Sequence, residues 1–385
     1  MPSRFILLVC LTVGASTFPV GPFPALLPDI ERALGLSDAE LGALAAAFGF
    51  ARMVVDVPVG FFVARHLRAA LILSPVLLSA GIFIVASGGP FPVLLAGRIV
   101  MGVAHSLGMV AWLTTILRYQ SGRSLGTALN ASEFTAMIGM LGGLATLAML
   151  PKAWSWNHAL VVACAPQVVG IVLAPLLVRA LDRHPGPPES PTSPDPVSTV
   201  APRGHGGTVA LAFAAGAAAA VAYSTLESYM VPLRGGREFD LDRAGVAQLL
   251  MLPLAVDLVA LMPLGLLTDR IGASRVLPAI TAVMALAVLL VSFGGFAAMV
   301  AGTALLGLAM AGWMLPLTVV RRETPPSLIA WRTALYRVGV DAGLFAGPLA
   351  AGLMGSSASL FAGGVVAALG ALTLLLAVRA RAPRS

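Results

Sequence analysis

Long apolar stretches constrain this chain more than any other feature of its sequence. Twelve can be marked, at about residues 5–27, 41–63, 69–87, 92–115, 124–147, 158–180, 208–231, 244–267, 275–295, 297–319, 328–354 and 357–379. A helix needs roughly 20 apolar residues to cross a bilayer, and lipid offers no hydrogen-bond partner to exposed backbone groups. The sequence therefore predicts an all-α membrane protein with twelve transmembrane helices.

The composition excludes an ordinary soluble domain. Apolar residues make up 58% of the chain and charged residues 11%, whereas soluble domains carry roughly 25% charged residues. The net charge of +7 comes from short arginine clusters between apolar stretches, not from a basic face with stacking aromatics, so nucleic acid is not an expected partner. Cys10 and Cys164 lie inside apolar stretches and are expected to be buried. The first stretch is too long for a cleaved signal and is expected to be a span.

The distribution of basic residues predicts the orientation in the membrane. With the N-terminus inside, most arginines, including Arg65, Arg118 and Arg270, fall on the face that holds both chain ends. The opposite face has only Arg32, Lys152, Arg234, Arg237 and Arg243. Because cytoplasmic loops carry an excess of Lys and Arg, both termini are expected in the cytoplasm. The high ratio of arginine to lysine and the richness in alanine and glycine suggest a GC-rich genome, and the expected location is a bacterial inner membrane.

Residues 181–207 differ in composition from the apolar stretches around them. They contain PGPPESPTSPDP followed by RGHGG, which is typical of a flexible linker. We therefore expect an N-terminal six-helix bundle at residues 1–180, a cytoplasmic linker at 181–207 and a C-terminal six-helix bundle at 208–385.

The two halves of the sequence match each other at a nearly constant offset. PVGFFVAR, Pro58–Arg65, corresponds to PLGLLTDR, Pro263–Arg270, 205 positions later. Ser37 and Asp242 occupy equivalent loops and are expected to cap the helices that follow, with Ser37 in a capping box with Glu40. These matches predict a duplication that produces two pseudo-symmetric six-helix bundles.

Motifs within the repeats resemble those of the major facilitator superfamily across essentially the whole chain. The cytoplasmic loop signature of that family, Gly-x-x-x-Asp-Arg-x-Gly, is matched in the second half by Gly265, Asp269, Arg270 and Gly272, followed by Arg275. The first-half copy keeps Gly60 and Arg65 but has Ala64 in place of the acid. The resemblance implies rocker-switch alternating access around a site between the halves, as in other transporters built from parallel repeats. It also implies that the loop residues form a cytoplasmic gate.

Glycines of the fifth and eleventh spans resemble, incompletely, a motif of drug antiporters. They are Gly139, Gly142 and Gly143 in the fifth span, and Gly343 and Gly347 in the eleventh. Three prolines, Pro19, Pro22 and Pro24, are expected to kink the outer end of the first span.

Charged side chains at membrane depth are costly and usually functional. Arg52 and Asp56 lie one turn apart on the second span, and Arg337 and Asp341 lie one turn apart on the eleventh. The resemblance makes these helices neighbours across the two halves, and matching depths favour ion pairs of Arg52 with Asp341 and of Asp56 with Arg337. The i,i+4 spacing also permits a pair within each helix, and this alternative stays open.

Two further acids, Glu133 on the fifth span and Asp257 on the eighth, lie at comparable depth. The resemblance makes these two helices neighbours as well. Two nearby carboxylates in a medium of low dielectric constant would not both stay ionised, so one is expected to hold a proton. This favours proton coupling, and a single acid hydrogen-bonded to a neighbouring helix is an equally good explanation.

Other side chains could border a central cavity. His105 could relay protons or pack as a neutral ring, and Arg98 matches a family arginine often tied to proton coupling or to an anionic substrate. Glu227 either lines the cavity or reaches the membrane surface. The aromatic candidates, each of which could also serve packing alone, are Trp112, Tyr223, Trp313 and Tyr336.

These observations favour a proton-coupled secondary transporter of a small organic solute, with efflux slightly preferred. One alternative is a proton-coupled importer of an organic anion, suggested by Arg52, Arg98 and Arg337, and another is a transport-inactive receptor of the same fold. The sequence has no catalytic motif, metal-ligand spacing or Gly-rich nucleotide loop with Lys, so no enzyme activity, metal or cofactor is expected besides the coupling proton. The expected partners of the chain, a monomer, are membrane lipid and a small-molecule substrate.

Overall fold

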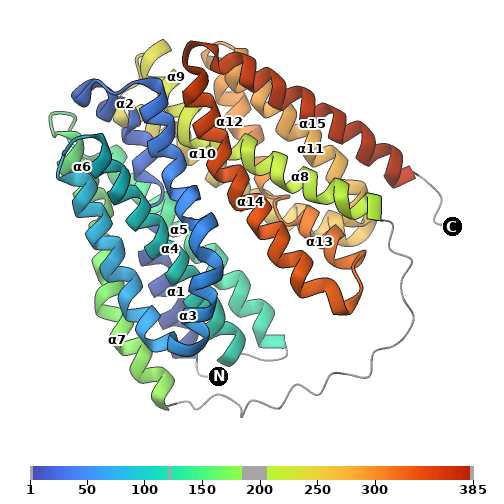
Figure 1. Cartoon of the computed structure of the whole chain (residues 1–385), viewed down its shortest axis with the longest axis horizontal. Coiled ribbons are helices and arrows are strands. Elements are labelled where there is room, and N and C mark those ends of the chain that lie inside the picture. The colour runs from blue at the N-terminus through green and yellow to red at the C-terminus, as the bar shows by residue number, and fades with distance from the viewer. Residues whose placement is uncertain (1–2, 120–122, 184–205, 382–385) are drawn as a thin grey trace. The chain divides into compact units, whose positions relative to one another are not determined.

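The computed structural model describes residues 3–119, 123–183 and 206–381, and helices carry all of the apolar stretches within them (Figure 1). In the first half the α-helices are α1 Ser3–Thr17, α2 Pro22–Leu34, α3 Asp38–Ala86, α4 Phe91–Tyr119, α5 Arg123–Met149, α6 Trp156–Cys164 and α7 Val168–Arg183. In the second half they are α8 Gly206–Thr225, α9 Val231–Glu238, α10 Arg243–Ile271, α11 Ala273–Phe293, α12 Phe296–Met310, α13 Leu315–Arg322, α14 Pro326–Met354 and α15 Ala358–Arg381. The described residues form no strand, so the predicted all-α class is confirmed.

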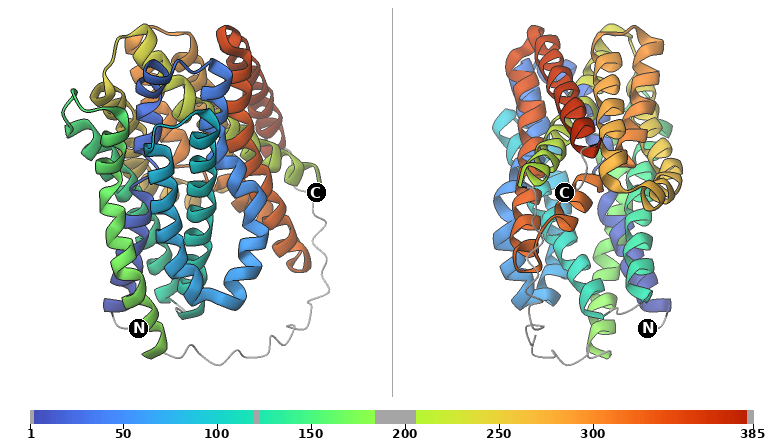
Figure 2. Two further views of the ribbon diagram at one scale, coloured as in Figure 1. Left: turned by 60° about the vertical axis from the view of Figure 1, so that its left-hand side comes forward. Right: turned by 90° about the vertical axis from the view of Figure 1, so that its right-hand side faces the viewer.

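Ten helical segments in the described residues are long and apolar enough to cross a membrane. Two of them, Asp38–Ala86 and Trp331–Arg381, are 49 and 51 residues long. The first has non-helical dihedral angles at His66, and Figure 2 shows α3 as two arms joined by a bend. The second is interrupted by a 3₁₀ turn at Gly355–Ser357. Division at these two breaks would produce the twelve spans that the sequence predicts.

Several local predictions are confirmed. The first apolar stretch breaks into α1 and α2 at residues 18–21, where the prolines were expected to kink it. Ser37 and Glu40 form the expected capping box, because the backbone N–H of Ser37 donates to Glu40 Oε2 over 2.9 Å and the N–H of Glu40 reaches Ser37 Oγ over 3.4 Å. Asp242 caps α10 by accepting from the Gly245 N–H over 2.8 Å.

The chain divides into two compact units. The described residues of Met1–Ile30 and Phe50–Val197 form the first unit, and those of Glu31–Gly49 and Ser198–Ser385 form the second. Residues 31–49 therefore pack with the second half of the sequence, although they lie within the expected N-terminal bundle. Of the expected linker, residues 181–183 continue α7 and 206–207 begin α8, while 184–205 lie outside the described residues.

Glycines bring α1 and α5 close together in the first unit. A Cβ atom at Gly139 would lie 2.2 Å from Thr17 Oγ1 and 2.3 Å from the carbonyl oxygen of Gly14. A Cβ atom at Gly143 would lie 2.2 Å from the carbonyl oxygen of Phe18. No other residue type fits these positions without movement of the backbone. The glycines of the fifth span thus form a packing surface for the first helix.

An equivalent seam joins α8 and α14 in the second unit. A Cβ atom at Gly343 would lie 2.8 Å from the Ala217 carbonyl oxygen, and one at Gly347 would lie 2.6 Å from both Thr225 Oγ1 and the Val221 carbonyl oxygen. Gly139 and Gly343 are 204 positions apart, as are Gly143 and Gly347. The sequence repeat is therefore also a repeat of helix packing.

A matched pair of Gly→Ala substitutions tests the α1–α5 seam. Gly143→Ala should destabilise the protein by roughly 1–3 kcal/mol, because the new methyl group overpacks against a backbone carbonyl. Gly364→Ala in α15 is the control, since a Cβ atom there meets nothing within 4 Å and alanine is the better helix former. The thermal midpoint of detergent-purified protein should fall for Gly143→Ala alone. Equal thermal midpoints for the two variants would contradict tight packing of α5 against α1 at Gly143.

Candidate functional site

Three of the predicted polar residues lie together between α3 and α4 in the first unit. The Ser106 hydroxyl donates to the Asp56 carboxylate, with 2.5 Å between Oγ and Oδ1. Arg52, one turn before Asp56, is close enough to His105 to interact with it electrostatically. Ser106 was not among the predicted residues, and its only signal in the sequence is a hydroxyl beside His105 within an apolar stretch.

The remaining charges of the predicted ion pairs lie in the second unit. Asp341 on α14 is 2% exposed, and Arg337, one turn earlier, is half-buried. Arg52 and Asp56 belong to the first unit, so the ion pairs between the halves stay a prediction. The alternative of a pair within each helix also stays open.

The two acids expected to support proton coupling differ in their surroundings. Glu133 is exposed on α5 of the first unit. Asp257 is half-buried on α10 of the second unit, and within the described part of the chain its Oδ1 atom is buried and has no hydrogen-bond partner. An ionised carboxylate is costly in such a place, so the position suits a group that binds and releases a proton.

Arg98 on α4 is almost fully buried, with 5% of its side chain exposed. Its guanidinium group lies over the ring of Phe23 on α2, 3.7 Å from the ring centroid. This arrangement is a cation–π contact, which is strongest away from water. Arg98 therefore lies in the α2–α4 interface of the first unit.

Three of the predicted cavity residues meet in the second unit. Glu227 lies in a π-helical turn, Leu226–Met230, between α8 and α9, and the Tyr223 hydroxyl hydrogen-bonds to its carboxylate. The Tyr223 ring contacts Trp313 edge-on, with 5.9 Å between ring centroids. Trp313 stands in the turn that separates α12 from α13, and with Gly312 it lines a small apolar cavity beside α8 and α11.

The other two aromatic candidates are buried in packed surroundings. Trp112 is 7% exposed and belongs to the apolar core of the first unit. Tyr336 is 5% exposed, packs edge-on against Phe213 at 5.8 Å, and occupies the space above Gly216 of α8. These contacts match the packing alternative that the sequence left open.

The intact loop signature forms the turn from α10 to α11. Gly272 has φ of +90° and ends α10, with its N–H donating to the Thr268 carbonyl over 2.8 Å. Glycine adopts this φ without strain, which explains its place in the motif. Gly265, Asp269, Arg270 and Arg275 are exposed around this turn.

The degraded first-half copy has a different contact. Arg118, at the end of α4, donates to the backbone carbonyl of Ala64 over 3.0 Å. Gly60 has open space around its Cα, and Arg65 is exposed. A backbone oxygen thus accepts from the arginine where the family signature has a carboxylate.

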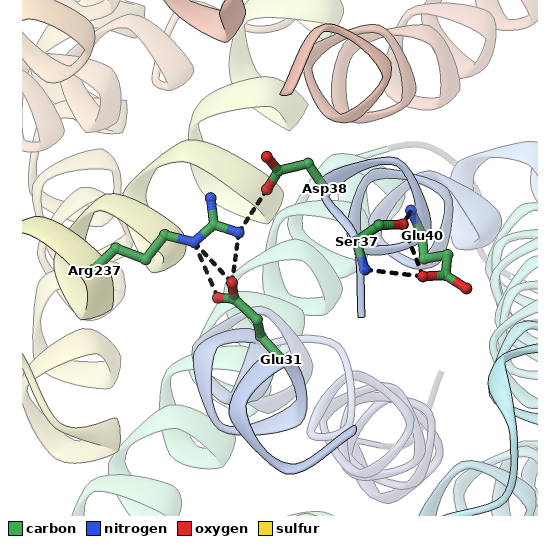
Figure 3. A network of polar contacts seen from close by, with 5 residues as sticks. All are labelled: Glu31, Ser37, Asp38, Glu40 and Arg237. Atoms are coloured by element: carbon green, nitrogen blue, oxygen red, sulfur yellow. Dashed lines mark hydrogen bonds and ion pairs between the residues drawn. The ribbon is translucent and has the colours of Figure 1, made fainter. Parts of the chain in front are cut away.

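An ion cluster not predicted from the sequence lies in the second unit (Figure 3). Arg237 near the end of α9 binds Glu31 with both Nε, at 3.0 Å, and NH2, at 2.7 Å, and its NH2 also donates to Asp38 over 2.5 Å. Asp38 is further hydrogen-bonded to Tyr229 of the π turn. In the sequence, the only sign of this cluster is one arginine and two acids near loops on the same predicted side of the membrane. That pattern is too common to identify a cluster.

Comparisons with known proteins agree with this architecture. The model of the Major Facilitator Superfamily matches residues 5–241 and 208–385, while no curated protein sequence matches the chain significantly. The structure resembles that of the nucleoside transporter NupG, with a TM-score of 0.75 at 13% identity over 97% of this chain and 99% of that one. It resembles a POT family transporter in complex with 5-aminolevulinic acid, with a TM-score of 0.80 at 11% identity over 98% and 96% of the two chains.

A third solved structure of the same fold is a bacterial homologue of the human lysosomal transporter Spinster. Its TM-score is 0.71 at 16% identity, over 98% of this chain and 95% of that one. These identities are low, so the structural matches show the fold alone, and the family model carries the assignment. The chain belongs to the Major Facilitator Superfamily.

Proposed function

We propose that the protein is a proton-coupled secondary transporter that exports a small organic solute across the bacterial inner membrane by alternating access, with both termini in the cytoplasm and as a monomer. Membership of a transporter family supports transport. The observation that supports proton coupling is the half-buried Asp257 carboxylate, whose Oδ1 atom has no hydrogen-bond partner in the described residues. Such a group is neutralised at lower cost than it is held as an ion.

Proteoliposome flux tests the coupling. Purified protein should move at least one member of a panel of labelled nucleosides, short peptides, organic cations and organic anions when a pH gradient is imposed. Asp257→Asn and Glu133→Gln should each abolish the pH-driven component. Asp182→Asn is the control, because Asp182 forms an exposed ion pair with Arg68, and such pairs contribute little. Flux that is independent of the pH gradient would contradict proton coupling.

An organic-anion importer remains the second candidate, supported by the buried guanidinium group of Arg98. The same flux experiment distinguishes the importer from the exporter. A proton-coupled importer would carry a labelled anion into the compartment that the protons enter. A transport-inactive receptor would bind a solute from the panel and move none.

The Arg237 cluster suits a contact that breaks and re-forms during alternating access. It ties α9, from the second half of the sequence, to the end of α2 and the start of α3, from the first half. Next to it α3 packs tightly on α14, because a Cβ atom at Gly42 would lie 2.7 Å from the Gly352 Cα. We infer that the ion cluster stabilises the form of the protein in which the start of α3 is packed against α14.

Cysteine labelling tests the inferred role of Arg237. Ala46, on the face of α3 that carries Gly42 and Gly49, is 1% exposed, so Ala46→Cys in a background without Cys10 and Cys164 reports opening of the seam. Arg237→Gln should speed labelling by a membrane-impermeant maleimide about three- to tenfold, which corresponds to roughly 0.7–1.4 kcal/mol.

The control for this labelling is Glu238→Gln, which removes a neighbouring charge whose partner, within the described residues, is Arg234 of the same helix. Reagent is added in parallel to intact cells and to inverted vesicles, so that the side of the membrane is identified independently. Equal labelling rates for Arg237→Gln and Glu238→Gln would contradict the inferred role.

A further inference from the structure

Glu227 lies in the one π-helical turn of the described residues, Leu226–Met230. A π turn widens the helix locally and frequently marks a functional site. The turn follows directly on the α8–α14 seam, where Ser224 Oγ donates to the Gly343 carbonyl over 3.3 Å and Thr225 lies against Gly347. The backbone that carries Glu227 is therefore continuous with a tightly packed seam of the second unit.

Within the described residues, the Glu227 carboxylate has a tyrosine hydroxyl as its partner and no basic side chain. The two arginines of the following helix, α9, bind other partners. Arg234 binds Glu238 and the carbonyl oxygens of Val291 and Gly294 at the end of α11, and Arg237 binds Glu31 and Asp38. A half-buried acid within a membrane span needs a counter-charge or a proton.

Aromatic surface adjoins this acid. The Tyr223 ring, one turn before Glu227, meets the Trp313 ring edge-on. Trp313 borders the apolar cavity whose other walls include Ala219 of α8 and Met284 of α11. The Glu227 carboxylate accepts from the Tyr223 hydroxyl, and the Trp313 ring lies next to that tyrosine. A carboxylate combined with aromatic rings binds quaternary and aromatic cations, because ring faces attract positive charge.

We propose that Glu227, Tyr223 and Trp313 form a binding site for an organic cation with an apolar body. The carboxylate supplies the counter-charge, and the Tyr223 and Trp313 rings contact the cation and its apolar substituents. This assignment names the substrate class of the proposed transporter and so rests on that function. Binding itself, however, can be measured without transport.

A pair of ions of the same shape and opposite charge tests the site. Equilibrium binding of labelled tetraphenylphosphonium and tetraphenylborate is measured on the full-length protein in nanodiscs, with protein-free nanodiscs subtracted. The phosphonium should bind at least tenfold more tightly than the borate. Glu227→Gln, which keeps the shape of the side chain, should weaken phosphonium binding at least tenfold, and Glu227→Asp should retain part of it.

Matched variants separate charge from packing. Glu238→Gln should bind the phosphonium as the unchanged protein does, because Glu238 pairs with Arg234 on the surface of α9. Trp313→Leu should weaken binding several-fold, whereas Trp331→Leu should not, since Trp331 is 67% exposed on α14. Thermal midpoints of all variants show whether each remains folded.

Two outcomes would overturn the site. They are equal affinities for the two ions, and unchanged phosphonium affinity in folded Glu227→Gln. Binding that depends on Glu227 but is accompanied by no flux in proteoliposomes would support the site and overturn the transport function instead.

Discussion

The close approach of helices at glycine positions is the constraint on which the rest of this structure depends. Lipid chains are as apolar as leucine, so helices in a membrane associate through tight packing and polar contacts rather than through the hydrophobic effect. Here Gly139 and Gly143 bring α5 against α1, and Gly343 and Gly347 bring α14 against α8. The second seam sets the position of the π turn and thus of Glu227, two residues beyond Thr225.

On this repeated scaffold the two halves carry different charges. The first unit buries a cation, Arg98, against an aromatic ring, whereas the second holds an acid, Glu227, beside aromatic rings. The loop signature differs in the same way, because Asp269 is replaced at the equivalent position by Ala64, whose carbonyl oxygen accepts from Arg118. A duplicated fold that binds one asymmetric solute has no need of symmetric charges.

The structural relatives illustrate how little the fold restricts the substrate. A nucleoside transporter and a POT family transporter share this architecture at TM-scores of 0.75 and 0.80, with 13% and 11% sequence identity. Function in such folds resides in the site and not in the scaffold. The substrate class must therefore be argued from particular side chains, and in the second unit these are one acid and two aromatic rings.

The sequence by itself determined the helical membrane class, the repeat, the family, the caps at Ser37 and Asp242 and the break in the first span. Each of these depends on composition or on residues within a few positions of one another. Only the tertiary structure decided which side chains meet. Asp56 and Ser106 are 50 residues apart and Glu31 and Arg237 are 206 apart.

Trp313 likewise reaches Tyr223 from the distant turn between α12 and α13, so no local pattern joins it to Glu227. A helix that is apolar on every face has no periodicity that shows which face turns toward a neighbour. That choice is made by the fit of glycines, turns and breaks between helices, and the position of each polar side chain follows from it.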